Sequence, residues 1–138
     1  MAGLRLYLLD TNIFLELLLD QDESGSVRAL LSTKNPEDLG ISDLALHSIG
    51  IILYQKKAAH IFSDFIDDLF WPGGLTIFTL GSEDIRHMEQ VSRAFRLDFD
   101  DAYQYVVAEK FDLALVSFDT DFDRTDRKRI TPADISGQ

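Results

Sequence analysis

The most concentrated chemistry in this chain is a run of alternating aspartates near its C-terminal end. Asp119, Asp121 and Asp123 directly follow the uncharged run 113–117, which is typical of a strand buried on both faces. In an open parallel sheet, ligands bind just beyond the carboxyl ends of the strands. Carboxylates held close together there repel one another unless a cation lies between them, so this pattern indicates a metal site.

Two further acidic positions are expected close to that strand end. Asp100 and Asp101 open the preceding helix, and packing of this helix on the sheet could bring one of them close to Asp119. Asp10 ends the first predicted strand, 4–9, and precedes an apolar helix. A carboxylate in that position can cap the helix or hold a metal, and the sequence leaves both roles open.

These acids would be positioned by strands that alternate with helices along the chain. Strands are predicted at 4–9, 39–41, 75–80 and 113–117, and helices at 13–19, 26–33, 44–53, 55–70 and 82–95, with one more opening at the Asp100–Asp101 pair. Parallel strands need crossovers of this kind. We therefore expect an α/β fold in which residues 1–138 form a single three-layer domain, with a short, mainly parallel central sheet flanked by helices.

Three local features add predictions of their own. The helix at 44–53 is apolar almost all round, so it should be deeply buried. His47 lies within it, and a lone histidine in such a setting is more often a hydrogen-bonded core residue than a ligand. The Trp-Pro-Gly-Gly run at 71–74 should end the helix at 55–70, and 130–132 could form an edge strand or an extended arm.

Composition limits the class of protein. The chain contains no cysteine, which excludes disulfides and cysteine-ligated zinc and fits a reducing cytosol. A net charge of −11 argues against non-specific binding to nucleic acid, but it allows a nuclease whose acids surround metal ions. The same charge suits a basic protein partner or simply keeps the protein soluble. No secretory leader or membrane-spanning apolar run stands out, so we expect a cytoplasmic protein that does not contact membranes.

Two segments and the order of the elements resemble a PIN domain, similar to VapC-type toxin ribonucleases. The segments are 6–12, LYLLDTN, and 99–123, FDDAYQYVVAEKFDLALVSFDTDFD. The family pattern has one acid in Asp-Thr-Asn after the first strand, one in an Asp-Ala pair, and one in an Asp-x-Asp-Phe run. By position, this resemblance assigns the catalytic acids to Asp10, Asp101, Asp119 and Asp121.

The resemblance implies an Mg²⁺- or Mn²⁺-dependent enzyme that hydrolyses RNA phosphodiester bonds with a metal-activated water. Asp10 and Asp101 would be the main metal ligands, while Asp119 and Asp121 would hold a second ion or orient water. Such toxins are typically homodimers, and an antitoxin protein neutralises them by placing a segment in the acidic site. Four basic residues could contact the RNA backbone or form a solvated charge run: Arg124, Arg127, Lys128 and Arg129.

One departure from the family pattern concerns the second metal ion. The family usually has a glutamate in the helix after the second strand, and that place falls at Ser48 here. Ser48 cannot supply the missing charge, although it could hold a metal-bound water, and Asp43 could compensate if its side chain turns inward. Asn12 and Ser117 are candidates for groups that support the ligands. One metal ion and two metal ions both remain compatible with this sequence.

Three other functions compete with the nuclease. The chief one is a PIN-fold RNA-binding or protein-interaction module that has lost efficient catalysis with its glutamate. The run 119–123 also resembles the start of a calcium loop, but Arg124 replaces the turn glycine and Ile130 replaces the bidentate acid. A receiver-type phospho-acceptor domain would need a lysine after a later strand, and Leu80 is followed by Gly81.

Overall fold

A central parallel sheet organises the described chain, residues 6–69 and 74–136. In this computed structural model the sheet has four strands in the order β3-β2-β1-β4, and all neighbouring strands in it pair in parallel. The strands are β1 (Tyr7–Leu9), β2 (Leu39–Ser42), β3 (Thr76–Phe78) and β4 (Ala114–Val116). The predicted parallel sheet is confirmed, and residues 4 and 5 of its first predicted strand lie outside the described residues.

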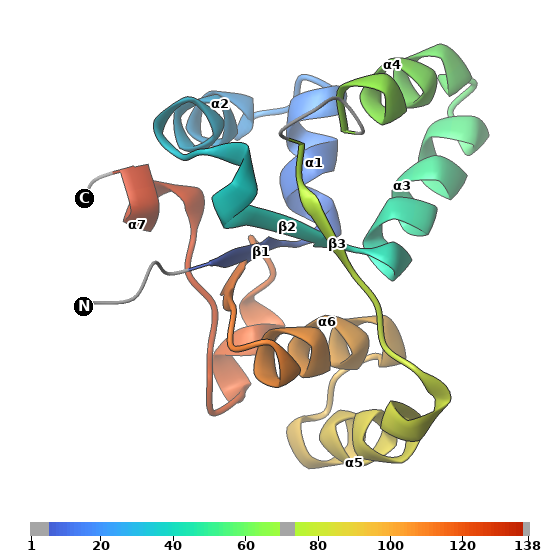
Figure 1. Cartoon of the computed structure of the whole chain (residues 1–138), viewed down its shortest axis with the longest axis vertical. Coiled ribbons are helices and arrows are strands. Elements are labelled where there is room, and N and C mark those ends of the chain that lie inside the picture. The colour runs from blue at the N-terminus through green and yellow to red at the C-terminus, as the bar shows by residue number, and fades with distance from the viewer. Residues whose placement is uncertain (1–5, 70–73, 137–138) are drawn as a thin grey trace.

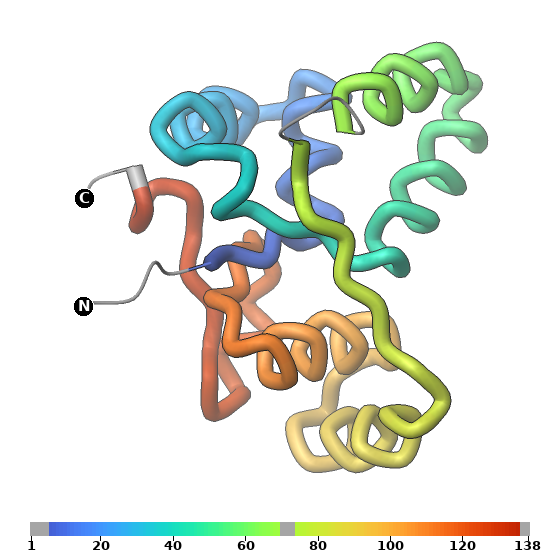
Figure 2. Tube along the Cα trace, in the orientation of Figure 1, coloured from blue at the N-terminus to red at the C-terminus, as the bar shows by residue number. Residues whose placement is uncertain are grey.

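Helices cover both faces of the sheet, which confirms the predicted three layers (Figure 1). One face carries α1 (Thr11–Leu18), α2 (Ser24–Thr33), α3 (Asp43–Gln55) and α4 (Ala59–Leu69), and the other carries α6 (Phe99–Lys110). α5 (Ile85–Phe95) packs on the outer side of α6, and α7 (Pro132–Ser136) contacts α2 (Figure 2). Short 3₁₀ helices lie between these elements: η1 (Pro36–Asp38), η2 (Ser82–Asp84) and η3 (Thr120–Arg124).

Side chains on opposite faces of the strands build two separate cores. In β1, Tyr7 and Leu9 belong to the core beneath α1–α4, whereas Leu8 between them belongs to the core beneath α6. β4 repeats this pattern, with Val116 on one side and Leu115 on the other. A strand covered on both faces has no solvent-facing side, which is why continuous apolar runs mark these strands in the sequence.

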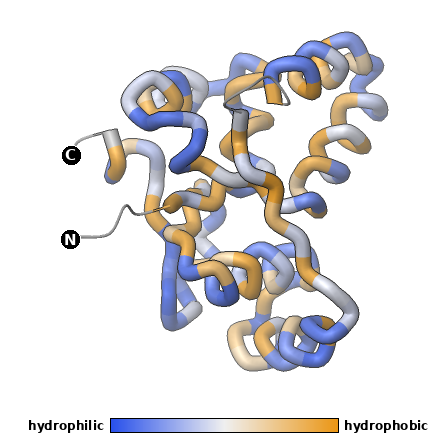
Figure 3. The backbone as a smooth tube through the Cα atoms, viewed as in Figure 1, coloured by the Kyte–Doolittle hydropathy of each residue, from blue (hydrophilic) through white to orange (hydrophobic). Residues whose placement is uncertain are grey.

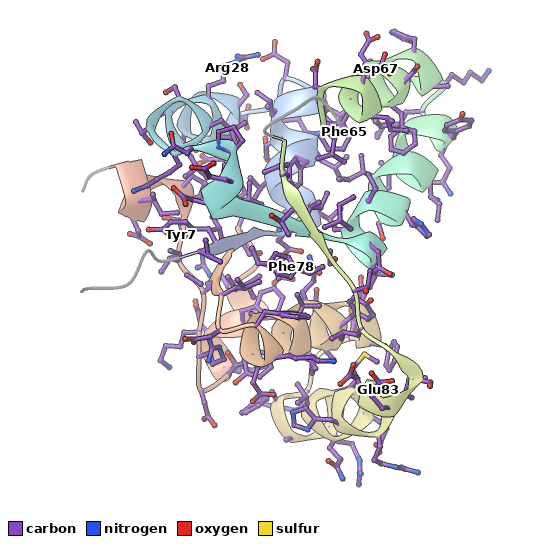
Figure 4. The ribbon with its side chains drawn as sticks, in the orientation of Figure 1. Tyr7, Arg28, Phe65, Asp67, Phe78 and Glu83 are labelled. Carbon is purple, nitrogen blue, oxygen red and sulfur yellow. The ribbon has the colours of Figure 1, made fainter. Side chains whose placement is uncertain are left out.

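Close packing between β2 and β3 depends on Gly40. A side chain at this position would collide with the ring of Phe78. Phe78 points from β3 toward the α6 layer, where its ring centroid lies 4.9 Å from that of Phe111 (Figure 4). Because Gly40 leaves room for this ring, an aromatic contact can join the edge strand to the α6 side of the sheet.

Helix α3 differs from its predicted environment. Ile49 is fully buried, but Ile51 and Tyr54 are 59% and 64% exposed, and His47 is exposed as well. The predictions of an all-round buried helix and of a core His47 are therefore wrong. The physical reason is that α3 lies at an outer corner of its layer, where one side packs against α1 and α4 and the other faces solvent (Figure 1).

Some element boundaries also differ from the predicted ones. The helix predicted at 55–70 begins later, because Lys57 takes a left-handed backbone conformation (φ 59°) between α3 and α4. Within the predicted edge strand 130–132, Ile130 forms one parallel bridge to β4. The helix stop predicted at 71–74 lies almost entirely outside the described residues. None of the helices within residues 6–69 and 74–136 is long and apolar enough to cross a membrane.

The two sides of α3 predict a contrast between matched substitutions. Ile49→Val removes one methylene from a fully buried site and is expected to lower the free energy of unfolding by about 1 kcal/mol. Ile51→Val makes the same change of helix propensity at an exposed site, so its effect should stay within about 0.5 kcal/mol. Urea denaturation of both variants measures the difference, and equal losses would contradict this orientation of α3.

Candidate active site

Two strand ends meet near the centre of the sheet and position the first acids. β1 lies between β2 and β4, and the chain leaves β1 through Asp10 and β4 through 117–119. The backbone N–H of Asp10 donates to the carbonyl oxygen of Val116 (2.9 Å), which holds the two ends side by side. The chain first adds β2 and β3 on one side of β1 and then β4 on the other. Open parallel sheets form their ligand-binding crevice at such a change of direction.

A cavity of about 340 Å³ lies at this crevice. The acids among its lining residues are Asp10, Asp100, Asp101 and Asp119. Asp101, Asp119 and Asp121 each offer a carboxylate oxygen, and these oxygens lie within 4.8 Å of one another. Asp98 and Asp100 form a second such group with Asp101. Asp101 belongs to both groups. It lies in the first turn of α6, and its side chain faces the strand ends.

Asp10 lines the same cavity and is held through both of its carboxylate oxygens. Oδ1 accepts hydrogen bonds from the backbone N–H of Thr11 (2.9 Å) and from Nε2 of Gln104 (2.9 Å). Oδ2 accepts one from the hydroxyl of Ser117 (2.6 Å). Asp10 is the N-cap of α1 and a cavity residue at the same time, so the two roles that the sequence left open are compatible.

Ser117 and Asn12, predicted as supporting residues, connect Asp10 to Asp119. While its hydroxyl donates to Asp10, the Ser117 oxygen accepts from the backbone N–H of Asp119 (3.0 Å) and from Nδ2 of Asn12 (3.3 Å). The amide oxygen of Asn12 accepts from the backbone N–H of Phe118 (3.3 Å). This network joins the end of β1 to the end of β4 and limits the movement of both acids.

The electrostatics of the cavity disfavour unpaired carboxylates. Burial raises the pKa of Asp10, and hydrogen bonds such as that from Ser117 counteract part of the rise. Burial also raises the pKa of Asp101 to about 7, and the carboxylates of Asp100 and Asp119 add to this rise. Positive charge in the cavity would remove the repulsion, and carboxylate oxygens are the ligands that Mg²⁺ and Mn²⁺ prefer. The donor set therefore fits a hard divalent cation.

Asp121 and Asp123 have different surroundings although they are two residues apart. The guanidinium group of Arg124 contacts Oδ1 of Asp121 (3.0 Å) and donates to two carbonyl oxygens at the C-terminal end of α5. Asp121 therefore belongs to the group of close acids, and the guanidinium group of Arg124 fixes its position. Asp123 pairs instead with Arg129 (3.2 Å). Neither Asp121 nor Asp123 is among the described residues that line the cavity, and only Asp121 has a carboxylate oxygen in the group with Asp101 and Asp119.

Ser48 lines the cavity, at the position where the resemblance to PIN domains implies a glutamate. Asp43 does not join it there, because Oδ1 of Asp43 accepts a hydrogen bond from the hydroxyl of Tyr103 (2.5 Å). Burial and this hydrogen bond raise the pKa of Tyr103 to about 12, which keeps the phenol protonated as a donor. The structure holds Asp43 on Tyr103 and leaves the cavity without an acid near Ser48 from this helix, as far as the described residues go.

Gln104 is a cavity residue that the sequence did not reveal. It lies in α6, one turn after Asp101, and is only 3% exposed. Its neighbours Ala102, Tyr105 and Val106 are buried apolar residues, so the local sequence indicates an apolar side of the helix and conceals the polar one. The available signal was a polar residue three positions after a candidate ligand, because residues three apart share one side of a helix.

The basic tail that follows the acids forms a hydrophilic stretch on the outside of the molecule (Figure 3). Its arginines pair with aspartates of the same chain: Arg124 with Asp121, Arg127 with Asp112 and Arg129 with Asp123. The ammonium group of Lys128 lies 3.4 Å from a backbone carbonyl oxygen. The guanidinium charges are already paired within the chain, and a contact of this tail with the RNA backbone stays a prediction.

A comparison with protein families finds one match for this chain. The family model described as PIN domain matches residues 7–128. A comparison with curated proteins finds no match.

Solved structures share the same arrangement of elements. A toxin–antitoxin complex from Klebsiella pneumoniae aligns with a TM-score of 0.72 at 17% identity, covering 91% of this chain and 97% of that chain. VapC20 from Mycobacterium tuberculosis, described as a sarcin-ricin loop cleaving toxin, aligns with a TM-score of 0.68 at 16% identity, covering 85% and 92%. FitAcB from Neisseria gonorrhoeae aligns with a TM-score of 0.68 at 18% identity, covering 91% and 96%. At these identities the matches demonstrate a shared fold.

Proposed function

This chain belongs to the PIN domain family, and from that membership we propose that it is an Mg²⁺- or Mn²⁺-dependent ribonuclease. One observation carries the proposal: Asp101, Asp119 and Asp121 bring carboxylate oxygens within 4.8 Å of one another beside the ends of two parallel strands. Acids held this close are stabilised by a divalent cation. RNA as the substrate is supported by the fold shared with VapC20, which is described as a sarcin-ricin loop cleaving toxin.

Four acids carry the proposed reaction: Asp10, Asp101 and Asp119 as metal ligands, and Asp121, which lies with Asp101 and Asp119 in the group of close carboxylate oxygens. Asp10 lies outside that group but lines the same cavity. A divalent ion bound there supplies positive charge that activates water and stabilises the charge developing on the phosphodiester oxygens. Ser117 donates to Asp10 and keeps its carboxylate oriented, and Asn12 holds Ser117 in place. Ser48 contributes a hydroxyl to the cavity that can hold a water molecule near the acids.

We further propose that the protein is the toxin of a type II toxin–antitoxin pair, acting in the cytoplasm as a homodimer of single PIN-like domains. The Klebsiella pneumoniae neighbour, which is described as a toxin–antitoxin complex, supports an antitoxin partner. The net charge of −11 and the acidic cavity suit a basic segment of such a protein.

Cleavage of RNA by the purified full chain tests the enzyme proposal. We expect cleavage of a mixed RNA substrate in the presence of Mg²⁺ or Mn²⁺, and its loss when EDTA removes the ion. The variant Asp67→Asn is a matched control, because it removes an exposed acid of α4, outside the residues that line the cavity, and should cleave like the wild type (Figure 4). A wild type that cleaves no RNA with either ion would contradict the proposal.

A PIN-fold RNA-binding or protein-interaction module is the second candidate. Ser48 favours it, because a hydroxyl stands where the family usually has a catalytic glutamate. Filter-binding measurements with the same RNA substrates distinguish the two functions. A wild type that retains RNA without cleaving it in Mg²⁺ or Mn²⁺ would identify the module, whereas metal-dependent cleavage would exclude it.

A further inference from the structure

A buried side-chain amide connects three elements of the active site. Gln104 of α6 lies between Asp10, at the end of β1, and Ser42, the N-cap of α3. Nε2 of Gln104 lies 2.9 Å from Oδ1 of Asp10, and Oε1 lies 2.5 Å from the hydroxyl oxygen of Ser42. The three residues are 3%, 6% and 0% exposed, so water does not compete strongly for these hydrogen bonds.

The neighbours of Gln104 determine which way its amide faces. The Ser42 hydroxyl oxygen accepts from the backbone N–H of Ala45 (3.0 Å), so its own proton is free to be donated to Oε1. A carboxylate accepts hydrogen bonds and has none to donate, so Asp10 requires the NH₂ end of the amide. The contact with Asp10 selects this orientation, because a flipped amide would place Oε1 against the carboxylate, whereas the Ser42 hydroxyl can pair with either end of the amide.

The same hydrogen bonds determine how Asp10 can bind a cation. A carboxylate oxygen has about two acceptor positions, and on Oδ1 both are used by the N–H groups of Thr11 and Gln104. Oδ2 accepts from Ser117 and from no other donor among residues 6–69 and 74–136, which leaves one acceptor position for a cation. Turning the plane of the carboxylate away from this orientation would break all three contacts, so the plane is held in place.

We infer that Gln104 is a positioning residue that holds Asp10 as a one-oxygen ligand, with Oδ2 presented to the cation. The inference rests on the proposed function only in taking Asp10 as a metal ligand. Because Ser42 begins α3 and Gln104 lies one turn after Asp101, the amide also keeps the three elements in register around the cavity. A residue of this kind affects the metal through the ligand it orients, without contacting substrate.

Mn²⁺ binding to the full-length chain tests this role without requiring catalysis. Gln104→Met keeps the length and volume of the side chain but cannot donate to Asp10. We expect Mn²⁺ affinity, measured by electron paramagnetic resonance of the free ion, to fall about 10- to 100-fold. Gln104→Asn has a side chain too short to reach both partners, so it should lower the Mn²⁺ affinity by a similar factor. It provides a second test if the methionine variant does not fold.

A double-mutant cycle shows whether Gln104 acts through Asp10. In an Asp10→Asn background, adding Gln104→Met should cause no further loss of Mn²⁺ affinity, because the oriented ligand is already absent. Tyr105→Phe is the matched control: it removes a hydroxyl from a buried position of α6 that lines a different cavity, and should leave Mn²⁺ affinity unchanged.

The possible outcomes separate this inference from the proposed function. If Asp10→Asn weakens Mn²⁺ binding but neither Gln104 variant does, the positioning role is overturned while the metal site stands. If Asp10→Asn itself leaves Mn²⁺ binding unchanged, Asp10 is not a ligand and the inference is overturned at its premise. Loss of affinity in the Gln104 variants with additive effects in the double mutant would also overturn it, since Gln104 would then act independently of Asp10.

Discussion

Asp101→Asn is expected to abolish RNA cleavage and, at the same time, to stabilise the metal-free protein. Asp101 belongs to both carboxylate groups of the cavity, so the substitution removes the charge that the two groups share. We expect the cleavage rate to fall by at least about 1,000-fold, equivalent to about 4 kcal/mol of transition-state stabilisation. Single-turnover cleavage of a labelled RNA in Mg²⁺ measures this loss.

The gain in stability has the same physical cause as the loss of activity. Burial and neighbouring acids raise the pKa of Asp101 to about 7, so above that pH the folded metal-free protein carries an unfavourable charge. Asparagine has nearly the same shape and no charge. Because Asp101 is partly exposed, we expect a gain of about 1 kcal/mol, which raises the melting temperature by about 4 °C at pH 8 in EDTA.

The combination of these two effects distinguishes a site residue from a structural one. Asp67→Asn, at an exposed position of α4, should change neither the cleavage rate nor the melting temperature measurably. An inactive Asp101→Asn with a lowered melting temperature would indicate damage to the fold. Retained cleavage in Asp101→Asn would contradict the assignment of this acid to the reaction.

Local sequence was sufficient to predict the sheet and the placement of its acids. Runs such as 113–117 are apolar because both faces of the strand are covered, and this leaves a signal within a few residues of sequence. Asp10 and Asp119 follow such runs directly, so the rule for parallel sheets brings them to one edge. The cavity at the ends of β1 and β4 includes both of them.

Contacts between distant elements could not be read in this way. Gln104 bonds to Asp10 across 94 positions, and Tyr103 to Asp43 across 60, so no local pattern contains either pair. The exposed side of α3 was missed for a related reason. Its apolar residues indicate a helix that can be buried, but whether a neighbour covers each side depends on the packing of the whole layer.

For the same reason, the sequence could not show whether Asp43 compensates for the glutamate that Ser48 replaces. The sequence identifies Ser48 as a departure from the family and offers Asp43 as a compensating acid, since the two residues share a helix. In the structure Asp43 accepts a hydrogen bond from Tyr103 of α6, and this contact holds it away from Ser48. Loss of one acid leaves the positions of Asp10, Asp101 and Asp119 around the cavity unchanged, because each is held by a different element.

Metal-free stability is expected to fall as the pH rises from 5 to 8. The pKa of Asp101 is about 7 in the folded protein and near its ordinary value of 3.8 in the unfolded chain, so the folded state binds the extra proton. Stability from this proton is fully present below about pH 4 and is lost as the pH rises through 7. Asp84, Glu89 and Asp134 have lowered pKa values, so their stabilisation is lost only on acidification and adds no slope above pH 5.

Mn²⁺ should reverse this trend, because a proton and a divalent ion compete for the same carboxylate. At about 100 times its dissociation constant, Mn²⁺ would add about 2.7 kcal/mol to the free energy of unfolding. The increase in melting temperature caused by a fixed Mn²⁺ concentration should therefore grow from pH 5 to pH 8 in the wild type, and stay small in Asp101→Asn. Scanning calorimetry in EDTA and in Mn²⁺ measures both series. An equal Mn²⁺ effect in the two proteins at every pH would mean that the ion binds elsewhere, since a site that includes Asp101 must exchange its proton for the metal.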